Sequence, residues 1–286
     1  MNDLQNRQRL PRWMKMKMPS GETYSKVRNL VERNQLHTIC VSGNCPNIGE
    51  CWGRGTATLM ILGDTCTRSC KFCGVKTGKP GPIDPGEPGR VAESIRMMNL
   101  KHCVITSVDR DDLPDGGAEA WANTIREIKR VNPPTTIEAL IPDFGGNEDC
   151  LDKLLSAGAE VISHNLETVR RLTPEVRSVA RYDLSLEVIR YIAGKGITAK
   201  SGIMLGLGET EGEILETMDD LLAAGCKVFT LGQYLAPSSL HYPVKAYIEP
   251  SKFEFYKETG LKKGFRYVES SPLVRSSYHA EKHVEG

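Results

Sequence analysis

The stretch TLMILGDTCTRSCKFCGV (58–75) joins a short apolar run to three closely spaced cysteines. The run at 58–62 has the length and apolar character of a buried strand. The cysteines that follow it, Cys66, Cys70 and Cys73, are spaced C-x3-C-x2-C. Because active sites of α/β folds lie beyond the C-terminal ends of their strands, this stretch predicts an α/β fold whose chemistry depends on the loop after its first regular strand.

Apolar runs of the same kind alternate with longer helical patterns along the chain. We expect six strands, at 58–62, 103–108, 136–141, 160–166, 198–205 and 228–234. We expect helices at 90–99, 117–131, 147–157, 183–194 and 211–224, with a short helix at 24–33 before the first strand. Such alternation implies parallel strands with right-handed crossovers. The sequence therefore predicts a partial (β/α)6 TIM-like barrel, with a doubly wound sheet as the alternative.

The regular pattern does not extend to either end of the chain. We expect three domains: an irregular N-terminal extension at 1–57, the barrel at 58–235, and a C-terminal extension at 236–286. Polar residues gather after the predicted strands, as in TSVD (106–109) and HNLE (164–167), and the second cysteine triplet lies at the same edge. One further strand is expected at 265–269.

Composition excludes several classes of protein. The 37 Lys and Arg residues nearly balance 36 Asp and Glu residues, so a net charge of +1 does not indicate nucleic acid or a membrane as a partner. No apolar run approaches the roughly 18 residues that span a bilayer, and the N-terminus lacks a signal-peptide core, so we expect a cytoplasmic protein. A basic stretch at 7–17 is either a solvated arm or a docking surface for an acidic protein, with Arg7, Arg9, Arg12, Lys15 and Lys17.

The chain has nine cysteines, and a second group of three, Cys40, Cys45 and Cys51, is spaced C-x4-C-x5-C. Thiols stay reduced in the cytoplasm, so clustered cysteines there indicate metal ligands. Zinc sites usually pair C-x2-C units and close with four ligands, whereas three thiolates on one loop can hold three irons of a 4Fe–4S cluster and leave the fourth open. The other three are expected to be small buried apolar residues: Cys103, Cys150 and Cys226.

The C-x3-C-x2-C loop, with the aromatic Phe72 before its last cysteine, resembles that of the radical S-adenosylmethionine (SAM) enzymes. The resemblance implies that the amine and carboxylate of SAM chelate the open iron. It also implies that one electron from the cluster cleaves SAM to a 5′-deoxyadenosyl radical. Seven stretches are similar to the lipoyl synthase family within this superfamily: ICVSGNCPNIGECW (39–52), GDTCTRSCKFCGV (63–75), TSVDRDDLPDGGAEAWA (106–122), SHNLETV (163–169), KSGIMLGLGET (200–210), GQYLAP (232–237) and VRSSYHAE (274–281).

The resemblance implies a sulfurtransferase that inserts two sulfur atoms, at C6 and C8, into an octanoyl chain on a lysine of a carrier domain. The implied carriers are the lipoyl domains of 2-oxoacid dehydrogenases and the glycine cleavage H protein. We expect a ferredoxin- or flavodoxin-type reductant and neither a nucleic acid nor a membrane as a partner. A biotin-synthase-like sulfur-inserting enzyme and a zinc-stabilised binding protein are the alternatives.

The resemblance also assigns the cluster ligands. Cys66, Cys70 and Cys73 would hold the SAM-binding 4Fe–4S cluster. Cys40, Cys45 and Cys51 would hold an auxiliary 4Fe–4S cluster, which donates sulfur. The fourth auxiliary ligand would be a serine of the motif Arg275-Ser276-Ser277-Tyr278; we assign Ser277, with Ser276 as the alternative. The chain ends would then meet over the open end of the barrel.

Contacts to SAM are implied at the ends of the strands. Phe72 would lean on the adenine ring, as would the segment that contains Gly202, Gly206 and Gly208. The amine and ribose contacts are expected from Thr106, Ser107, Asp109, Asn165 and Glu167. The candidates for the SAM carboxylate are basic residues: Arg177, Lys200 and Arg181.

Overall fold

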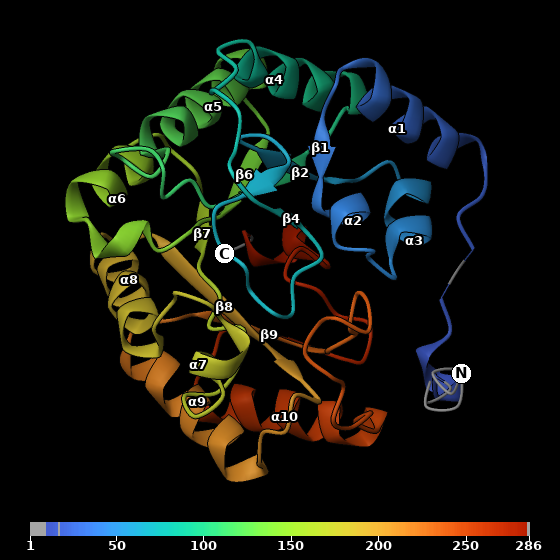
Figure 1. Ribbon diagram of the computed structural model, residues 1–286, viewed down its shortest axis with the longest axis vertical. Coiled ribbons are helices and arrows are strands. Elements are labelled where there is room, and N and C mark those ends of the chain that lie inside the picture. Colours follow the sequence, from blue (N-terminus) through green and yellow to red (C-terminus); the bar gives the residue numbers. More distant parts are fainter. Residues whose placement is uncertain (1–9, 17, 285–286) are drawn as a thin grey trace.

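The computed structural model describes residues 10–16 and 18–284, and its centre is a sheet of eight strands (Figure 1). The strands lie in the order β1-β2-β5-β6-β7-β8-β9-β10, and every neighbouring pair is parallel except β1 and β2. Their bounds are His37–Thr38, Thr58–Ile61, His102–Ser107, Thr136–Leu140, Val161–Ser163, Thr198–Leu205, Val228–Gln233 and Tyr267–Ser270. The sheet curls without joining β1 to β10, so the predicted partial barrel is confirmed.

The helices between the strands form an arc around the outside of this barrel (Figure 1). They are α4 (Glu87–Met98), α5 (Ala118–Val131), α6 (Glu148–Leu155), α8 (Tyr182–Gly194), α9 (Glu211–Ala223) and α10 (Pro250–Lys263). The first five match the predicted helices, and β10 matches the strand expected at 265–269. At the N-terminal side, α1 (Glu22–Arg33) is the predicted short helix.

Several elements lie where no regular structure was expected. They are the 3₁₀ helices η1 (Arg12–Met14), η2 (Phe144–Gly146) and η3 (Ala280–His283), the short helices α2 (Ile39–Ser42), α3 (Ile48–Gly53) and α7 (Thr173–Val176), and the strands β1, β3 (Thr65–Cys66) and β4 (Lys76–Thr77). Helix α10 was also missed. The division into three domains stays a prediction, although β1 and β10 carry the sheet past both expected boundaries.

Local sequence explains where the helices begin. Asn147 caps α6, because its side chain accepts a hydrogen bond from the Cys150 N–H at 3.1 Å. Thr210 and Glu213 form a capping box at the start of α9. Helix α4 ends at Asn99, whose φ of 52° places it in the left-handed region that asparagine tolerates.

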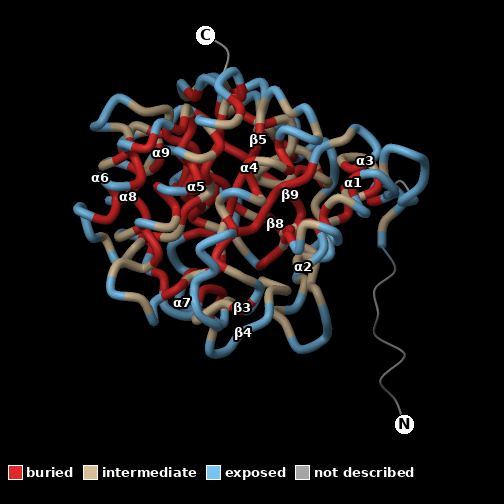
Figure 2. The backbone as a smooth tube through the Cα atoms, turned by 90° about the horizontal axis from the view of Figure 1, so that it is seen from above, coloured by how far each residue is buried: buried red, intermediate tan, exposed pale blue. Residues whose placement is uncertain are grey.

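Buried residues follow the strands and the inner faces of the helices, while exposed residues cover the outside (Figure 2). Every residue of β2 and β9 is buried, as expected for parallel strands covered by helices. Cys103, Cys150 and Cys226 are buried, as predicted. No helix within the described residues is long and apolar enough to cross a membrane. Of the basic stretch at 7–17, Arg12 and Lys15 are exposed; Arg7, Arg9 and Lys17 lie outside the described residues.

The end of β2 turns the chain into the cysteine loop. Leu62 has a φ of 68° and Gly63 a φ of 94°, so two successive residues adopt left-handed backbone. Such a conformation is costly for leucine, and a buried partner stabilises it here. The carboxylate of Glu87 accepts a hydrogen bond from the Leu62 N–H at 2.7 Å. The first residue of α4 therefore fixes the direction in which the loop leaves the sheet.

Candidate active site

A cavity of about 600 Å³ opens at the C-terminal ends of the strands and brings both cysteine triplets together. The second triplet lines it completely, and Cys40 and Cys45 represent the first. The C-terminal tail contributes Ser276 and Ser277 to the same wall. The C-terminal tail lies inside the ring of strands and helices (Figure 1), so residues from the N-terminal region and from the tail contribute to one cavity.

The loop that carries the second triplet is closed by backbone hydrogen bonds. Strands β3 and β4 pair in parallel, and the Gly78 N–H donates to the Cys66 carbonyl at 2.9 Å. The Lys71 N–H donates to the Val176 carbonyl at 2.9 Å, which ties the loop to the end of α7. The Lys71 carbonyl accepts from the Tyr242 N–H at 2.8 Å. The three cysteines are therefore presented by a loop anchored on several sides.

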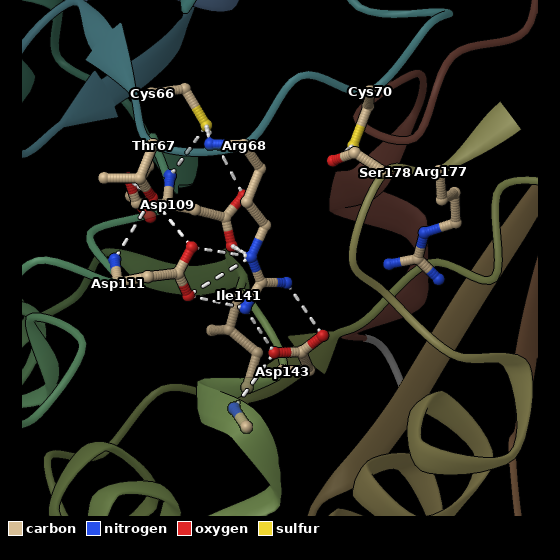
Figure 3. Close-up of polar contacts among 12 residues, drawn as sticks. Cys66, Thr67, Arg68, Cys70, Asp109, Asp111, Ile141, Asp143, Arg177 and Ser178 are labelled. Carbon is tan, nitrogen blue, oxygen red and sulfur yellow. Dashed lines mark hydrogen bonds and ion pairs between the residues drawn. The ribbon is translucent and has the colours of Figure 1, made fainter. Parts of the chain in front are cut away.

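Arg68 is buried beneath this loop and fixes it to the barrel (Figure 3). Its guanidinium donates two 2.8 Å hydrogen bonds to Asp143 and lies 2.8 Å from Asp111. Asp109 is 3.4 Å away. Burial favours the neutral form of the Asp143 carboxyl, but the Arg68 guanidinium outweighs this effect and holds the pKa of Asp143 well below its usual range. Arg68 lies between the first two cysteines of the loop. Its ion pairs with Asp111 and Asp143 therefore join the loop to the segments that follow β5 and β6.

The thiols of the second triplet have polar neighbours. The N–H groups of Asp109 and Arg68 donate to the Cys66 sulfur at 3.3 and 3.4 Å, and the Cys66 thiol contacts the Asp109 carboxylate at 3.6 Å. Cys70 lies 4.0 Å from the Ser178 hydroxyl. Burial raises the pKa of Cys66 to about 11 and that of Cys73 to about 12. These thiols are neutral without a metal, and metal binding would displace their protons.

The first triplet lies on two short helices of the N-terminal region and the turn between them. Thr38 caps α2, which contains Cys40; the Cys45 N–H donates to the Cys40 carbonyl at 3.0 Å, and Cys51 lies in α3. Burial, with smaller contributions from the Cys40 and Cys45 thiols, raises the pKa of Cys51 to about 12. Cys51 therefore lies within electrostatic range of the other two cysteines of its triplet.

The two serines of the tail face different partners. The Ser277 hydroxyl accepts a hydrogen bond from the Thr58 hydroxyl at 2.8 Å, and the Thr58 backbone N–H lies beside the Cys40 thiol. The Ser276 hydroxyl accepts from the Asn165 side chain at 2.7 Å, on the side of the barrel. Ser277 therefore lies toward the first triplet, which favours it over Ser276 as a ligand there.

The described side chains are not arranged to hold a single metal ion. Among the described residues, no three His, Cys, Asp or Glu side chains converge closely enough to hold one metal ion. A multi-iron cluster needs its thiolates spread around a larger group. The buried indole N–H of Trp52 also has no hydrogen-bond partner among these residues, although it lies beside the Cys40 thiol. A thiolate in a cluster would accept this hydrogen bond.

Most of the residues expected to contact SAM line the cavity: Phe72, Thr106, Ser107, Asp109, Asn165, Glu167 and Arg177. Arg177 is buried, and its Nε–H has no hydrogen-bond partner in the described chain. Glu167 has a φ of 66°, and burial raises its pKa despite the nearby Arg177. A half-buried acid and a buried cation with a free donor are suited to the ammonium and carboxylate of an amino acid.

Lys200 does not line this cavity, which corrects the expectation that it binds the SAM carboxylate. Its ammonium is fully buried and donates to the Glu138 carboxylate at 2.7 and 2.8 Å. The physical reason is its position near the start of β8, whereas the cavity lies at the opposite ends of the strands. Arg181 is exposed and also lies outside the cavity lining.

Several functional neighbours were missed from the sequence. They are Trp52, Thr58, Arg68, Asp143, Ser178 and Arg275. Arg68 stands between two cysteines, which was the one available signal. Its partner Asp143 is 75 positions away, so only the folded chain shows the pair.

Two family models match most of the chain, and curated relatives match nearly all of it. Residues 60–221 match the radical SAM superfamily, and residues 2–45 match the N-terminal domain of lipoyl synthase. A lipoyl synthase of Bacteroides fragilis strain YCH46 is 64% identical over 97% of this chain and 96% of its own length. A lipoyl synthase of Flavobacterium psychrophilum is 60% identical over 96% of this chain and 95% of its own.

Solved structures share the fold at low identity. Methylornithine synthase has a TM-score of 0.55 at 12% identity, covering 86% of this chain and 74% of its own. The FeFe-hydrogenase maturase HydG from Carboxydothermus hydrogenoformans has a TM-score of 0.57 at 13% identity, covering 91% of this chain and 68% of its own. These similarities establish the partial barrel and nothing about the substrate.

Proposed function

We infer the following activity for a chain that belongs to the lipoyl synthase family of the radical SAM superfamily. It is a sulfurtransferase that inserts two sulfur atoms, at C6 and C8, into an octanoyl chain carried on a lysine of a lipoyl domain. One observation supports this activity above others: the second cysteine triplet, two cysteines of the first triplet and a serine of the tail line one cavity. Two unactivated carbons each need a radical and a sulfur donor, so the reaction needs two sites within reach of one substrate.

The cofactors of this family are two 4Fe–4S clusters and SAM. Cys66, Cys70 and Cys73 would hold one cluster; Cys40, Cys45, Cys51 and Ser277 would hold the other. When bound, these groups supply an electron that cleaves SAM to a radical, and sulfide for the product. The hydroxyl oxygen of Ser277 is a harder ligand than a thiolate and is poorly matched to such a cluster. Its weak hold favours opening of the site toward the substrate.

The SAM contacts follow from charge and position. Arg177 would bind the SAM carboxylate through its unpartnered Nε–H, and Glu167 would bind the ammonium. Asp109 would support the loop through Cys66, while Asn165 already bonds to Ser276 in this state. Phe72 lies on the cavity wall, where its ring would exclude water from the cluster and contact the adenine.

The substrate is an octanoylated lipoyl domain, and the finer identity of the partners is part of the proposal. We expect the lipoyl domains of 2-oxoacid dehydrogenases and the glycine cleavage H protein as carriers, and a ferredoxin- or flavodoxin-type protein as reductant. The cavity wall has apolar side chains near its opening, including Leu10 and Met16 of the N-terminal arm, which suit an octanoyl chain. The exposed Arg12 and Lys15 beside them would favour an acidic carrier.

The activity is tested with anaerobically reconstituted protein. It should be brown and carry about eight irons per chain if both clusters are 4Fe–4S. With an octanoylated lipoyl-domain peptide, SAM and dithionite, we expect 5′-deoxyadenosine and a product heavier by two sulfur insertions, both read by mass spectrometry. The unoctanoylated peptide is the control. Colourless zinc protein would contradict the proposal, as would conversion of dethiobiotin in place of the octanoyl peptide.

A further inference from the structure

A fully buried ion pair lies in the barrel interior, away from the cysteine site. Glu138 of β6 and Lys200 of β8 each have 0% of their side chains exposed. Both stand at the third position of their strands, and alternate strands of a barrel place side chains in one interior layer. Although burial favours the neutral acid, Lys200 and His283 hold the pKa of Glu138 below its ordinary value. Glu138 is therefore ionised at neutral pH although it lies in the core.

The same ammonium also binds the C-terminal tail. Lys200 donates to the Ser276 carbonyl at 2.6 Å and lies 3.3 Å from Nδ1 of His283 in η3. His283 is buried and also lies 3.8 Å from the Glu138 carboxylate. An ammonium has three donors, and here two bind Glu138 and the third binds the tail. The last 3₁₀ helix of the chain thus inserts into the barrel and reaches the pair.

A buried ion pair rarely stabilises a protein more than apolar side chains of similar volume would at the same positions. The contact that apolar side chains would lose is the hydrogen bond to the Ser276 carbonyl. Asn165 holds the hydroxyl of the same serine at 2.7 Å. Because Ser276 is held at both its carbonyl and its hydroxyl, the direction in which Ser277 leaves it is fixed.

We propose that Lys200, supported by Glu138, is a positioning residue that fastens the tail inside the barrel and so presents Ser277 to the first cysteine triplet. The proposal rests on the proposed function, in which Ser277 is a ligand of the auxiliary cluster. Lys200 touches neither SAM nor the substrate in this assignment. It acts at a distance, through one backbone carbonyl.

The test uses variants that distinguish loss of the tail contact to Lys200 from general destabilisation of the fold. K200M/E138L replaces both charges by apolar side chains, which avoids leaving one charge unpaired in the core. H283F keeps the Lys200–Glu138 pair and removes only the imidazole contact to it. The control is K129M/E160L, because Lys129 and Glu160 form a partly exposed ion pair at 2.5 Å that does not contact the tail. Thermal unfolding confirms that each variant is folded.

The first readout is amide hydrogen exchange of the tail peptide at 272–284 in the apoprotein. We expect K200M/E138L to raise exchange in this peptide about tenfold, H283F to raise it less, and the control to leave it unchanged, since exchange reports local opening. Unchanged exchange in K200M/E138L would overturn the proposal. This readout needs no cluster, so it does not depend on the identity of the auxiliary ligand.

The second readout is iron release to a chelator in two backgrounds. C66A/C70A/C73A keeps only the auxiliary site, and C40A/C45A/C51A keeps only the SAM site. K200M/E138L should speed release about tenfold in the first background and not in the second, as expected when a ligand loses its support. Equal acceleration in both would indicate general loosening and overturn the proposal. S277A in the first background is the reference variant. If S277A releases iron no faster than its background, Ser277 is not the auxiliary ligand and the assignment in the proposed function fails. Hydrogen exchange of the tail peptide still tests whether Lys200 holds the tail in place.

Discussion

Each of the two triplets provides three cysteine thiols, but the structures that hold them differ. The second lies on one loop that Arg68 and backbone bonds hold against the barrel, and its open side faces Arg177 and Glu167. The first has Cys40 and Cys51 on two short helices and Cys45 between them, and it lies toward Ser277, which comes from the far end of the chain. In the proposed function, one site is left open to a small molecule and the other is closed by the protein. The comparison teaches that support and closure, more than the number of thiols, decide what a three-cysteine site can do.

The largest expected difference is between loss of one triplet and loss of the other. Replacing Cys66 by Ala should abolish SAM cleavage, because the electron source is lost. Replacing Cys40 by Ala should leave SAM cleavage measurable and abolish sulfur insertion. Mass spectrometry of 5′-deoxyadenosine and of the lipoyl peptide separates the two products. Lipoyl product from the Cys40 variant would mean that the first triplet is not the donor site.

Arg68 should matter for the second triplet alone. R68M leaves Asp143 buried without its cation and should lower the free energy of unfolding by about 3–5 kcal/mol. It should also lower the iron content of the C40A/C45A/C51A background, in which only the second triplet remains. Chemical denaturation and iron analysis provide the measurements. R96M is the control, because Arg96 forms an exposed pair with Glu93 and its loss should change neither quantity.

Ser277 should matter for the first triplet alone. S277A should weaken iron retention at the auxiliary site by about 10- to 100-fold, whereas S276A should have a smaller effect. Chelator kinetics in the C66A/C70A/C73A background measure this difference. S277C should retain iron better than the wild type but transfer sulfur more slowly, because a thiolate is the better-matched ligand. If S276A weakened iron retention more than S277A, Ser276 would be the auxiliary ligand in place of Ser277.

The acid in the Arg68 pair predicts a dependence on pH. The pKa of Asp143 in the folded protein lies below its unfolded value, so its stabilisation is fully present at neutral pH. That stabilisation is lost as the pH falls below about 4, where the unfolded carboxylate takes up a proton. D143N lacks this carboxylate, so its free energy of unfolding should fall less between pH 7 and pH 3 than that of the wild type. Urea midpoints of the two proteins from pH 7 to pH 3 test the prediction, and parallel curves would contradict it.

The smallest expected effect concerns Trp52. W52F keeps the ring packed on Tyr24 and removes the N–H beside Cys40, which is worth about 1 kcal/mol as a hydrogen bond. The auxiliary cluster should become harder to reduce, while the SAM cluster should keep its potential. Spectroelectrochemistry in the single-site backgrounds measures both potentials. W13F is the control, because Trp13 is exposed and belongs to neither cysteine triplet.

The strands and the ligands were predictable for different reasons. Buried parallel strands are continuous apolar runs, so β2, β5 and β9 were clear from the sequence. The cysteine spacings and their family resemblance identified the site. Helix α10 was missed because it is weakly amphipathic and contains Gly260. Residues 250–263 therefore lack the periodic apolar face by which a helix is recognised.

Contacts between distant residues could not be predicted in the same way. Lys200 belongs to a family motif near a strand, which suggested a place at the cavity; its register in β8 instead directs it to Glu138. Arg68 and Asp143, and likewise Thr58 and Ser277, are paired only by the fold. Composition carries no signal for such pairs, because each residue alone is an ordinary polar side chain.

The hydrogen bond between Thr58 and Ser277 joins positions 219 residues apart. During synthesis, the first triplet leaves the ribosome long before Ser277 has been translated. The second triplet and its Arg68 partners are complete much earlier, once Asp143 has emerged. If Ser277 is the fourth ligand, the two sites become available in a fixed order, with the auxiliary site last. A chain that stops short of Ser277 would then carry the six cysteines of both triplets and still lack the proposed closing ligand, so only a full-length chain could complete the auxiliary site.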